Sequence, residues 1–597
     1  MAGMADFSAS SLDRRQLIGG TAGIGALLAL GGQAASGQDG ERVFHGAWPY
    51  EEPPTGHFNS FVANNLLPVP NIYGDLIMLP LGMYYWASGD WLPLLATEWS
   101  FVDDAFEVRL REGVTWSDGS DFTAEDVLAT FWCLRLQSNT VFQYVDEITA
   151  VDDYTVTFHM SLPSTVVERY VIRMSPRPAS VFGDVAARAR DLFEGGGSLE
   201  DPEGRQLLDA LNQFRPDTYV GTGPFVLDTT TLTSARFDLV RNETGYLADE
   251  VAFDRIVVFN GRADVIAPMV LEGEVDYATH GFPPASERQM INEGIRIVRP
   301  PIYSGPAIYV NYTRHGETLG DKRVRQAIAH AIDRVQNGVV ALDQSGVGVE
   351  LMAGFSDNQV PSWLSDEAIA GLNRYAFDRE RAAALLEEAG WTKDGDLWTM
   401  SNGEPARFEL SHTAEFQDWT SAATDAAEQL LDFGIDLTLV GVTAAQIAEE
   451  VNNGNFDLAI QGWGNSSNPH PHFSYAQALF TFNTIPQQQG KPGMAFDLVQ
   501  QTDVAGEVDL QALTIECAQG LDEELQREQV TTIAQVFNEL LPVIPLWERY
   551  GNNPVLEGER VESWPPDDDP IYQNSIYADG IPTMLMLTGE LRPVGGA

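Results

Sequence analysis

Lysine is almost missing from this chain of 597 residues. Only Lys322, Lys393 and Lys491 occur, and the total of 35 basic residues faces 86 acidic ones, for a net charge of −51. Nucleic acid needs clustered basic side chains on its protein partner, so the composition excludes a nucleic-acid-binding function. Acidic residues recur along most of the chain. This favours surface carboxylates adapted to concentrated salt, and hence a halophilic archaeal source, over one cationic partner.

Cysteine is equally scarce. Cys133 and Cys517 are the only two cysteines, which are too few for a disulfide framework or a cysteine-rich metal site. We expect two separate buried thiols. His470 and His472 have a spacing that could ligate a metal, but no third ligand is nearby in the sequence, so we expect no metal site and no cofactor.

The usual catalytic motifs are also missing. The sequence has no Gly-x-Ser-x-Gly elbow, no His-Glu-x-x-His pair and no nucleotide-binding loop. We therefore expect a binding protein and not an enzyme. A secreted hydrolase of unfamiliar type is the alternative outside that class.

The first 37 residues have the layout of an export signal. Arg14 and Arg15 precede an apolar, glycine-rich run over residues 17–30, and small residues follow at 34–37. The run is too short for a membrane span, and the paired arginines are typical of the twin-arginine class. We expect an exported protein, extracellular or associated with the outer face of the cytoplasmic membrane. No cysteine follows the run, so the sequence leaves the mode of attachment open.

The segment from Phe106 to Leu134 predicts a strand, a turn, a short strand and a capped helix. Apolar and charged residues alternate over 106–111, as in a half-buried strand. Asp118-Gly119 provides a turn, and Thr123 is placed to cap a helix whose apolar face includes Val127. This segment is part of the structural scaffold and contains no recognisable catalytic or binding motif.

Within it, residues 110–127, LREGVTWSDGSDFTAEDV, closely resemble the signature of the family 5 solute-binding proteins of ABC importers, the dipeptide and oligopeptide group. Residues 321–334, DKRVRQAIAHAIDR, are a second specific match. Weaker matches follow the same order along most of residues 43–550, at 92–104, 221–225 and 530–549.

The resemblance implies an α/β, two-lobed periplasmic-binding-protein-like fold of type II with an extra inserted domain. Lobe 1 is expected to comprise residues 43–72, 217–308 and 541–597, the inserted domain 73–216, and lobe 2 309–540. It further implies that a peptide-like small-molecule solute binds between the lobes of a monomer, which then docks on an ABC permease in the membrane.

From Phe408 onward, strands and helices alternate, which predicts parallel strands with helical crossovers. The last of these strands leads into the segment Gln461–Pro469. Ligands in open α/β sheets bind beyond the carboxyl ends of strands, so we take this segment as the candidate ligand site. The predicted contacts, with two asparagines from the aromatic-rich segment 43–72, are Trp463, Gly464, Asn465, Ser466, Asn468, Asn64 and Asn65.

Two alternatives stay open at this site. Trp463 is either a stacking surface for the ligand or a core residue at the end of its strand. In peptide-binding relatives this loop is expected to hold a ligand-facing tryptophan and an aspartate that pairs with the peptide ammonium. Trp463 matches that tryptophan, but Ser466 stands near the aspartate position and residues 461–473 contain no acid. Peptide is the nominal solute, with an oligosaccharide or a blocked peptide as the alternative.

Overall fold

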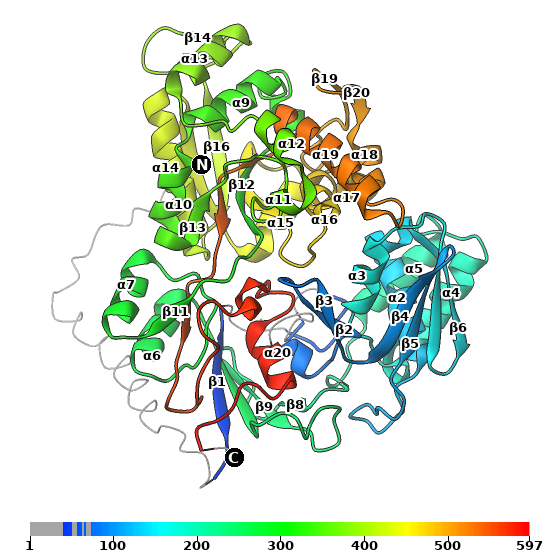
Figure 1. Cartoon of the computed structure of the whole chain (residues 1–597). Helices are drawn as coiled ribbons and strands as arrows, with labels where there is room; N and C mark the ends of the chain where they lie inside the picture. The colour runs from blue at the N-terminus through cyan, green and yellow to red at the C-terminus, as the bar shows by residue number, and fades with distance from the viewer. Residues whose placement is uncertain (1–39, 50–55, 63–64, 67–72, 596–597) are drawn as a thin grey trace, which may run out of the picture.

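The structure is a computed structural model that describes residues 40–49, 56–62, 65–66 and 73–595. The expected export signal therefore lies outside the described residues. Three sheet-centred units are separated in Figure 1, and we call them lobe 1, the inserted domain and lobe 2. In the described part of the chain, no helix is long and apolar enough to cross a membrane.

Lobe 1 is built on a four-stranded sheet in the order β1 (Val43–Trp48), β10 (Arg255–Asn260), β9 (Arg236–Arg241) and β8 (Phe225–Asp228). Strand β1 pairs with β10 in parallel, and the other pairs are antiparallel. Two helices cover this part of the lobe, α6 (Ala263–Leu271) and α7 (Pro284–Asn292). The chain thus returns to its first strand after more than 200 residues, which makes lobe 1 discontinuous in sequence.

The inserted domain contains an antiparallel sheet in the order β4 (Ala96–Val102), β5 (Ala105–Leu110), β7 (Thr155–Met160) and β6 (Val145–Asp152). Its main helices are α2 (Ala124–Leu136), α4 (Ala179–Glu194) and α5 (Pro202–Gln213). Helix α2 begins with a capping box between Thr123 and Asp126, so the predicted cap is confirmed.

Lobe 2 has a five-stranded sheet in the order β17 (Asp436–Val442), β16 (Arg407–Thr413), β18 (Leu458–Gly464), β12 (Ser304–Val310) and β21 (Ile544–Pro545). Strand β16 runs parallel to both β17 and β18, joined through α14 (Gln417–Phe433) and α15 (Ala444–Asn452). The predicted alternation of strands and helices is confirmed. Strand β12 begins in the range expected for lobe 1, yet its whole length pairs with β18.

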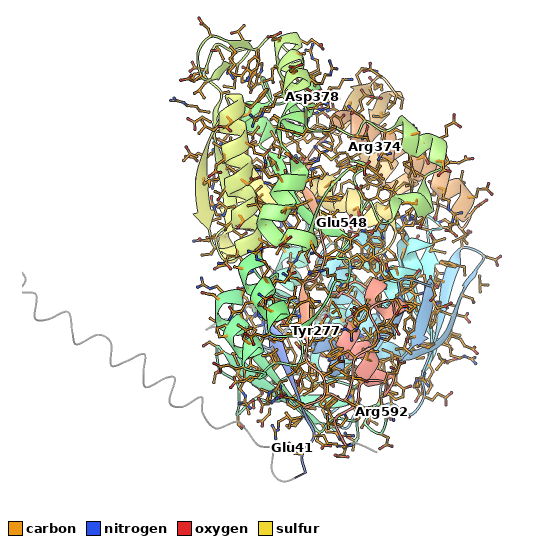
Figure 2. All side chains as sticks on the ribbon, turned by 60° about the vertical axis from the view of Figure 1, so that its left-hand side comes forward. Glu41, Tyr277, Arg374, Asp378, Glu548 and Arg592 are labelled. Carbon is orange, nitrogen blue, oxygen red and sulfur yellow. The ribbon has the colours of Figure 1, made fainter. Side chains whose placement is uncertain are left out.

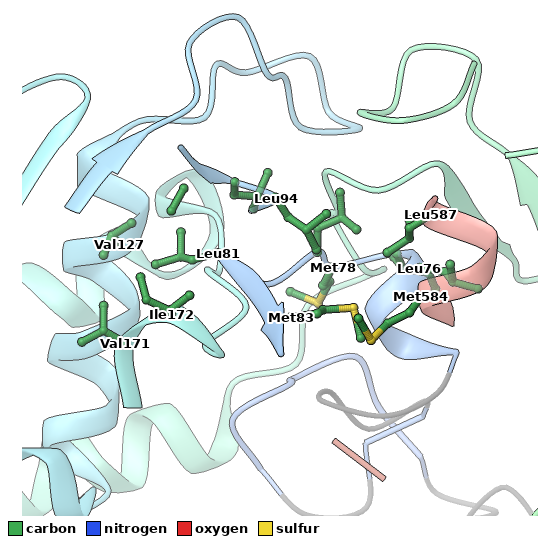
Figure 3. Close-up of a cluster of buried hydrophobic side chains, with 14 of the residues drawn as sticks. Leu76, Met78, Leu81, Met83, Leu94, Val127, Val171, Ile172, Met584 and Leu587 are labelled. Carbon is green, nitrogen blue, oxygen red and sulfur yellow. The ribbon is translucent and has the colours of Figure 1, made fainter. Parts of the chain in front are cut away.

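Three hydrophobic clusters divide the described part of the molecule differently from the three sheets. The first runs through lobe 1 and the inserted domain, the second fills lobe 2, and a small third one packs under α6 and α7 in lobe 1. Figure 3 shows the first cluster where the segment leading into the insert, helices α2 and α3 (Val166–Ile172) and the C-terminal helix α20 (Ile581–Leu587) meet. Its labelled side chains are Leu76, Met78, Leu81, Met83, Leu94, Val127, Val171, Ile172, Met584 and Leu587. Lobe 1 and the inserted domain therefore form one packed body.

Both cysteines are buried and free. Cys133 lies on α2 in the inserted domain, and Cys517 follows α18 (Leu510–Glu516) in lobe 2. Burial raises the pKa of the Cys133 thiol to about 12, so it stays protonated and unreactive at neutral pH. The expectation of two separate buried thiols is confirmed.

Candidate ligand site between the lobes

Two chain segments cross between the lobes, and we call them the hinge segments. Residues 299–304 run from lobe 1 into β12, and residues 547–553 return, starting with β22 (Trp547–Arg549). They hold each other through backbone hydrogen bonds, from Ile302 N to Arg549 O at 3.0 Å and from Gly551 N to Pro300 O at 2.8 Å. Two pockets open beside this crossing: Ile302 lines one of them, and its neighbour Tyr303 lines the other.

The first pocket, which we call the Asp418 pocket, has a volume of about 390 Å³. It is bounded by lobe 1, by lobe 2 and by the returning hinge segment. Residues that matter for its chemistry are Arg262, Asp264, Thr279, His280, Glu415, Phe416, Asp418, Trp419, Ser466, Arg549 and Tyr577. Its wall therefore combines five ionisable side chains, those of Arg262, Asp264, Glu415, Asp418 and Arg549, with the rings of Phe416 and Trp419.

Asp418 and Arg549 face each other in this pocket. Asp418 is the second residue of α14, only 7% exposed, and its Oδ2 lies 3.7 Å from Nη1 of Arg549. That distance is too long for a hydrogen bond, and within the described residues Asp418 Oδ2 has no hydrogen-bond partner. Burial raises the pKa of Asp418, while the charge of Arg549 opposes the rise.

Lobe 1 contributes neutral polar groups to the same pocket. The Thr279 side chain is fully buried, and its Oγ1 has no hydrogen-bond partner in the described part of the chain. The carbonyl oxygen of Thr279 accepts from Nη2 of Arg549 and from the Tyr577 hydroxyl, both at 3.4 Å. Burial lowers the pKa of His280 to about 3, so its ring is neutral at ordinary pH.

The second pocket, the Trp86 pocket, has a volume of about 730 Å³ and lies between the inserted domain and lobe 2. Several aromatic rings line its wall, and Trp86 stacks on Tyr303 with ring centroids 4.4 Å apart. The other residues that characterise it are Tyr84, Trp91, Phe101, Glu168, Arg169, Asn358, Trp363, His470, Glu523 and Arg527. Stacked rings with charged groups at intervals suit a ligand with apolar faces and polar edges.

A buried ion network fixes the inserted-domain side of this pocket. Asp579, fully buried near the C-terminus, accepts from Arg169 at 2.8 Å and pairs with Arg173 at 3.1 Å. It also accepts from Trp86 Nε1 at 2.8 Å and from the backbone of Tyr84 at 2.9 Å. Burial favours protonation of Asp579, but the two guanidinium groups outweigh it and hold its pKa below the usual range. The C-terminal segment thus orients Trp86.

The predicted loop Gln461–Pro469 lies between the two pockets, but Trp463 does not line either of them. Its side chain is 1% exposed in the lobe 2 core, and its Nε1 donates to the carbonyl oxygen of Trp547 at 3.3 Å. The structure therefore places this ring at the core position, which is one of the two alternatives left open by the sequence. Trp463 points inward from β18 and packs under the returning hinge segment.

The residues after Trp463 bridge the lobes. Gly464 has φ +72°, and a Cβ there would lie 2.5 Å from the carbonyl oxygen of Tyr303, so only glycine fits. Asn465 Oδ1 accepts from the backbone of Asn468 at 2.8 Å and closes a turn. Ser466 lines the Asp418 pocket, and its carbonyl oxygen accepts from the Ser575 hydroxyl.

The two other predicted contacts come from the N-terminal segment. Asn64 lies outside the described residues. Asn65 donates to the carbonyl oxygen of Val62 at 2.8 Å and accepts from the Tyr219 hydroxyl at 3.1 Å. It lines neither of the two pockets. Of the predicted contacts that lie within the described residues, Ser466 alone lines one of these two pockets.

The two histidines after the loop are engaged in packing. His470 Nδ1 accepts from the backbone of His472 at 3.1 Å, and the His472 ring contacts the carbonyl oxygen of Thr514 at 2.7 Å. Burial lowers the pKa of His472 to about 4. Over the described ranges, no group of three or more His, Cys, Asp or Glu side chains is arranged to hold a metal ion.

Sequence reasoning missed Asp418, Arg549 and Thr279. A signal for Asp418 was available, since it follows the carboxyl end of β16, where ligands bind in such sheets. Arg549 and Thr279 belong to segments far away in sequence. Only the fold brings them to the same pocket.

Comparison with known proteins shows which family and which relatives the chain is similar to. A family model described as "Bacterial extracellular solute-binding proteins, family 5 Middle" matches residues 90–484. The nickel-binding periplasmic protein of Escherichia coli (strain K12) is 24% identical over 453 residues, covering 72% of this chain and 76% of that protein. The dipeptide-binding protein of the same organism is 23% identical over 453 residues, covering 70% and 75%.

Solved structures agree. The periplasmic oligopeptide-binding protein of an oligopeptide ABC transporter from Thermotoga maritima superposes with a TM-score of 0.73 at 19% identity, covering 93% of this chain and 100% of that one. The same protein with mannohexaose bound gives 0.71 at 19% identity, covering 94% and 100%. The fold is thus the two-lobed type II fold with an extra domain that the sequence resemblance implied.

Proposed function

The chain belongs to the bacterial extracellular solute-binding proteins of family 5, and from this membership we propose that it captures a solute between its lobes and delivers it to an ABC importer. The observation that carries the proposal is the cleft: two pockets lie beside two crossing hinge segments, between bodies with separate hydrophobic cores. Bilobed proteins of this build close around the ligand by rotation at the hinge. The partner is a membrane permease, and the chain acts as a monomer without a cofactor or a catalytic step.

A peptide-like molecule is the proposed solute. Relatives in the family are named for dipeptides and oligopeptides, and the Asp418 pocket offers both a carboxylate and a guanidinium group. Peptide termini carry the complementary charges. The two pockets together give room for side chains next to a charged end.

An oligosaccharide is the second candidate, and a specific observation favours it. The Trp86 pocket is rich in tryptophan and tyrosine rings, which stack on the apolar faces of sugars. One neighbour in fold has been solved with mannohexaose bound. The neutral loop residues Asn465–Asn468 also suit hydroxyl groups.

The proposal also includes export of the protein from the cytoplasm. The twin-arginine-type signal over residues 1–37 directs the protein to the outer face of the cytoplasmic membrane, and the excess of carboxylates adapts its surface to a saline exterior.

The proposal that the two lobes close around a solute can be tested with the solute that co-purifies with the native protein. Mass spectrometry identifies this solute, and small-angle scattering compares the stripped and the reloaded protein. We expect a smaller radius of gyration and a higher melting temperature on reloading. Identical dimensions in both states would contradict capture by closure, and chemical conversion of the solute would favour the hydrolase alternative.

A further inference from the structure

The inserted domain and lobe 2 touch each other at a place outside the hinge segments. Gly520 N of lobe 2 donates to the carbonyl oxygen of Pro163 at 2.7 Å, and the Ser164 hydroxyl donates to the carbonyl oxygen of Ala518. In Figure 1 the chain between α18 and α19 (Glu523–Leu540) reaches the inserted domain near α3. Ser164 and Ala518 are fully buried, so the two bodies are packed together here and do not merely meet at an exposed edge.

His472, at the start of α16 (Pro471–Ala476), lies in this contact. Its ring is fully buried, and two hydroxyl groups of the inserted domain face it. Tyr144 Oη lies 3.3 Å from Nδ1, and Tyr170 Oη lies 3.4 Å from Nε2. Nδ1 is also 2.7 Å from the carbonyl oxygen of Thr514. Because a carbonyl oxygen only accepts, Nδ1 carries the proton of the neutral ring and Nε2 accepts from Tyr170. The neutral imidazole is therefore hydrogen-bonded on both sides of the interface.

Apolar side chains of both bodies surround the imidazole. Phe473 and Ala518 belong to lobe 2, yet both are part of the hydrophobic cluster that runs through lobe 1 and the inserted domain. The rings of Phe473 and Tyr170 have centroids 4.8 Å apart. Ile515 packs against the same cluster, and its carbonyl oxygen accepts from the Tyr144 hydroxyl at 3.5 Å. The histidine contact and the contact at Ala518 thus form one continuous interface.

The ring has no carboxylate among its hydrogen-bonding partners in the described part of the chain. The titratable groups that face it are those of Tyr144, Tyr170, His470 and Cys517. Glu168 and Arg169 of α3 and Glu523 of α19 line the Trp86 pocket, and Glu516 of α18 is exposed. A protonated imidazole in this interface would therefore be a buried cation without a counter-charge, which is costly.

The protonation state of His472 is consequently coupled to the contact. Burial lowers its pKa to about 4, whereas an imidazole in water has a pKa of about 6.5. Between pH 6.5 and pH 4 the separated bodies bind a proton that the packed bodies do not bind. Acid therefore weakens the contact over this range, and above pH 7 the contact no longer depends on this group.

We propose that these residues form an acid-released latch, which holds lobe 2 against the inserted domain at neutral pH and separates when His472 takes up a proton. The latch comprises Tyr144, Ser164, Tyr170, His472 and Ala518. None of these five residues lines the Asp418 pocket or the Trp86 pocket, so the inference goes beyond solute capture and is independent of the identity of the solute. His470, two residues before His472, does line the Trp86 pocket, so release in acid would also loosen one wall of that pocket.

Hydrogen exchange at the Gly520 amide measures the latch directly, because its acceptor, the carbonyl oxygen of Pro163, belongs to the other body. The solute-stripped full-length protein is exchanged in molar potassium chloride at pH 7 and at pH 5, and each protection factor is corrected for the intrinsic exchange rate. We expect the Gly520 protection factor to fall about 20-fold from pH 7 to pH 5, as follows from the two pKa values of His472. Amides within α14, in the core of lobe 2, should keep their protection factors.

His472→Gln removes the titration and keeps a neutral polar side chain, so its Gly520 protection factor should be the same at both pH values. His330→Gln is the matched control and should retain the fall, since His330 is also buried in lobe 2 and bonded to a backbone carbonyl oxygen, that of Ala376, at 2.7 Å. Ser164→Ala is a second latch variant. It should lower the Gly520 protection factor about 5-fold at both pH values, the effect of one hydrogen bond, and should keep the fall between them.

A Gly520 amide that is unprotected at pH 7, or equally protected at pH 7 and pH 5, would overturn the proposal. A fall of the same size in His472→Gln as in the wild type would overturn it too, as would a fall shared by the amides of α14. If His472→Gln does not fold, an unchanged Gly520 protection factor in Ser164→Ala contradicts the latch. All these measurements are made without solute, so solute capture is judged separately by the scattering experiment.

Discussion

Arg169 of the inserted domain donates from Nε to Oδ1 of Asn468 at 3.1 Å, although Asn468 lies in lobe 2. The same guanidinium donates to the carbonyl oxygen of Ser467 at 2.5 Å and forms a buried ion pair with Asp579. The Ser575 hydroxyl adds a contact to the carbonyl oxygen of Ser466. The conformation described is thus one in which the loop of lobe 2 touches the opposite body.

Removing one of these contacts should loosen the association between the lobe 2 loop and the opposite body. For Asn468→Ala we expect a loss of about 1.5–3 kcal/mol of closure free energy, as for a hydrogen bond to a charged donor, and hence a larger radius of gyration with bound solute. Asn402→Ala, on the exposed surface of lobe 2, is the control. Equal scattering profiles for both variants would show that the Arg169 contact does not hold the lobes together.

Replacement of Trp463 should affect folding more than binding. The ring is buried in the lobe 2 core, so Trp463→Ala should destabilise the solute-free protein by about 3–5 kcal/mol. Trp363→Ala removes a half-buried ring from the wall of the Trp86 pocket and should leave the melting temperature nearly unchanged. If Trp463→Ala melts like the wild type and binds poorly, the ring is a ligand surface after all.

The buried carboxyl of Glu548 should make stability depend on pH. In Figure 2 it lies at mid-height between the two bodies, and it accepts from Asn358 Nδ2 at 2.9 Å and from the Ser356 hydroxyl. Burial raises its pKa from 4.5 to about 7, and the nearby charge of Asp357 adds to the rise. A raised pKa stabilises the fold below pH 4.5, and this contribution is lost as pH rises through 7.

Glu548→Gln imitates the protonated carboxyl and should remove that loss. We expect it to raise stability at pH 8 by about 3 kcal/mol relative to the wild type, and to change little at pH 4.5. Thermal melting of both proteins across this range gives the measurement, with exposed Glu507→Gln as the control. A constant difference between wild type and Glu548→Gln at all pH values would contradict the assignment.

Salt should also change stability. With a net charge of −51, repulsion between carboxylates reaches further as the Debye length grows from about 3 Å at 1 M to about 10 Å at 0.1 M. The melting temperature should therefore drop steeply between molar and 0.1 M potassium chloride. A flat profile would mean that the acidity serves something other than adaptation to salt.

The sequence predicted those parts of the fold that depend on local patterns. Thr123 caps α2, and the strands and helices after Phe408 alternate as expected. Each of these follows from residues within one turn or one strand of each other. The cap side chains bond to their own helix, and the period of apolar residues fixes which face is buried.

The site could be predicted only in part, because its chemistry depends on long-range contacts. The absence of acids from residues 461–473 favoured a neutral ligand, yet Asp418 reaches the cleft from a different helix of lobe 2. The burial of Trp463 depends on Trp547, which returns from the far end of the chain. No local pattern encodes the pairing of Trp463 with Trp547.

The shared core of lobe 1 and the inserted domain makes these two units one rigid body. Because one hydrophobic cluster runs through both, a small rotation at the crossing of residues 299–304 and 547–553 must carry the outer sheet of the insert as well. Displacement at the far rim of such a body grows with its distance from the hinge segments. Under the proposed function, closure around a small solute would therefore change the spacing between the two outer surfaces by a large amount, and a permease touching both surfaces would detect an occupied cleft without contacting the solute.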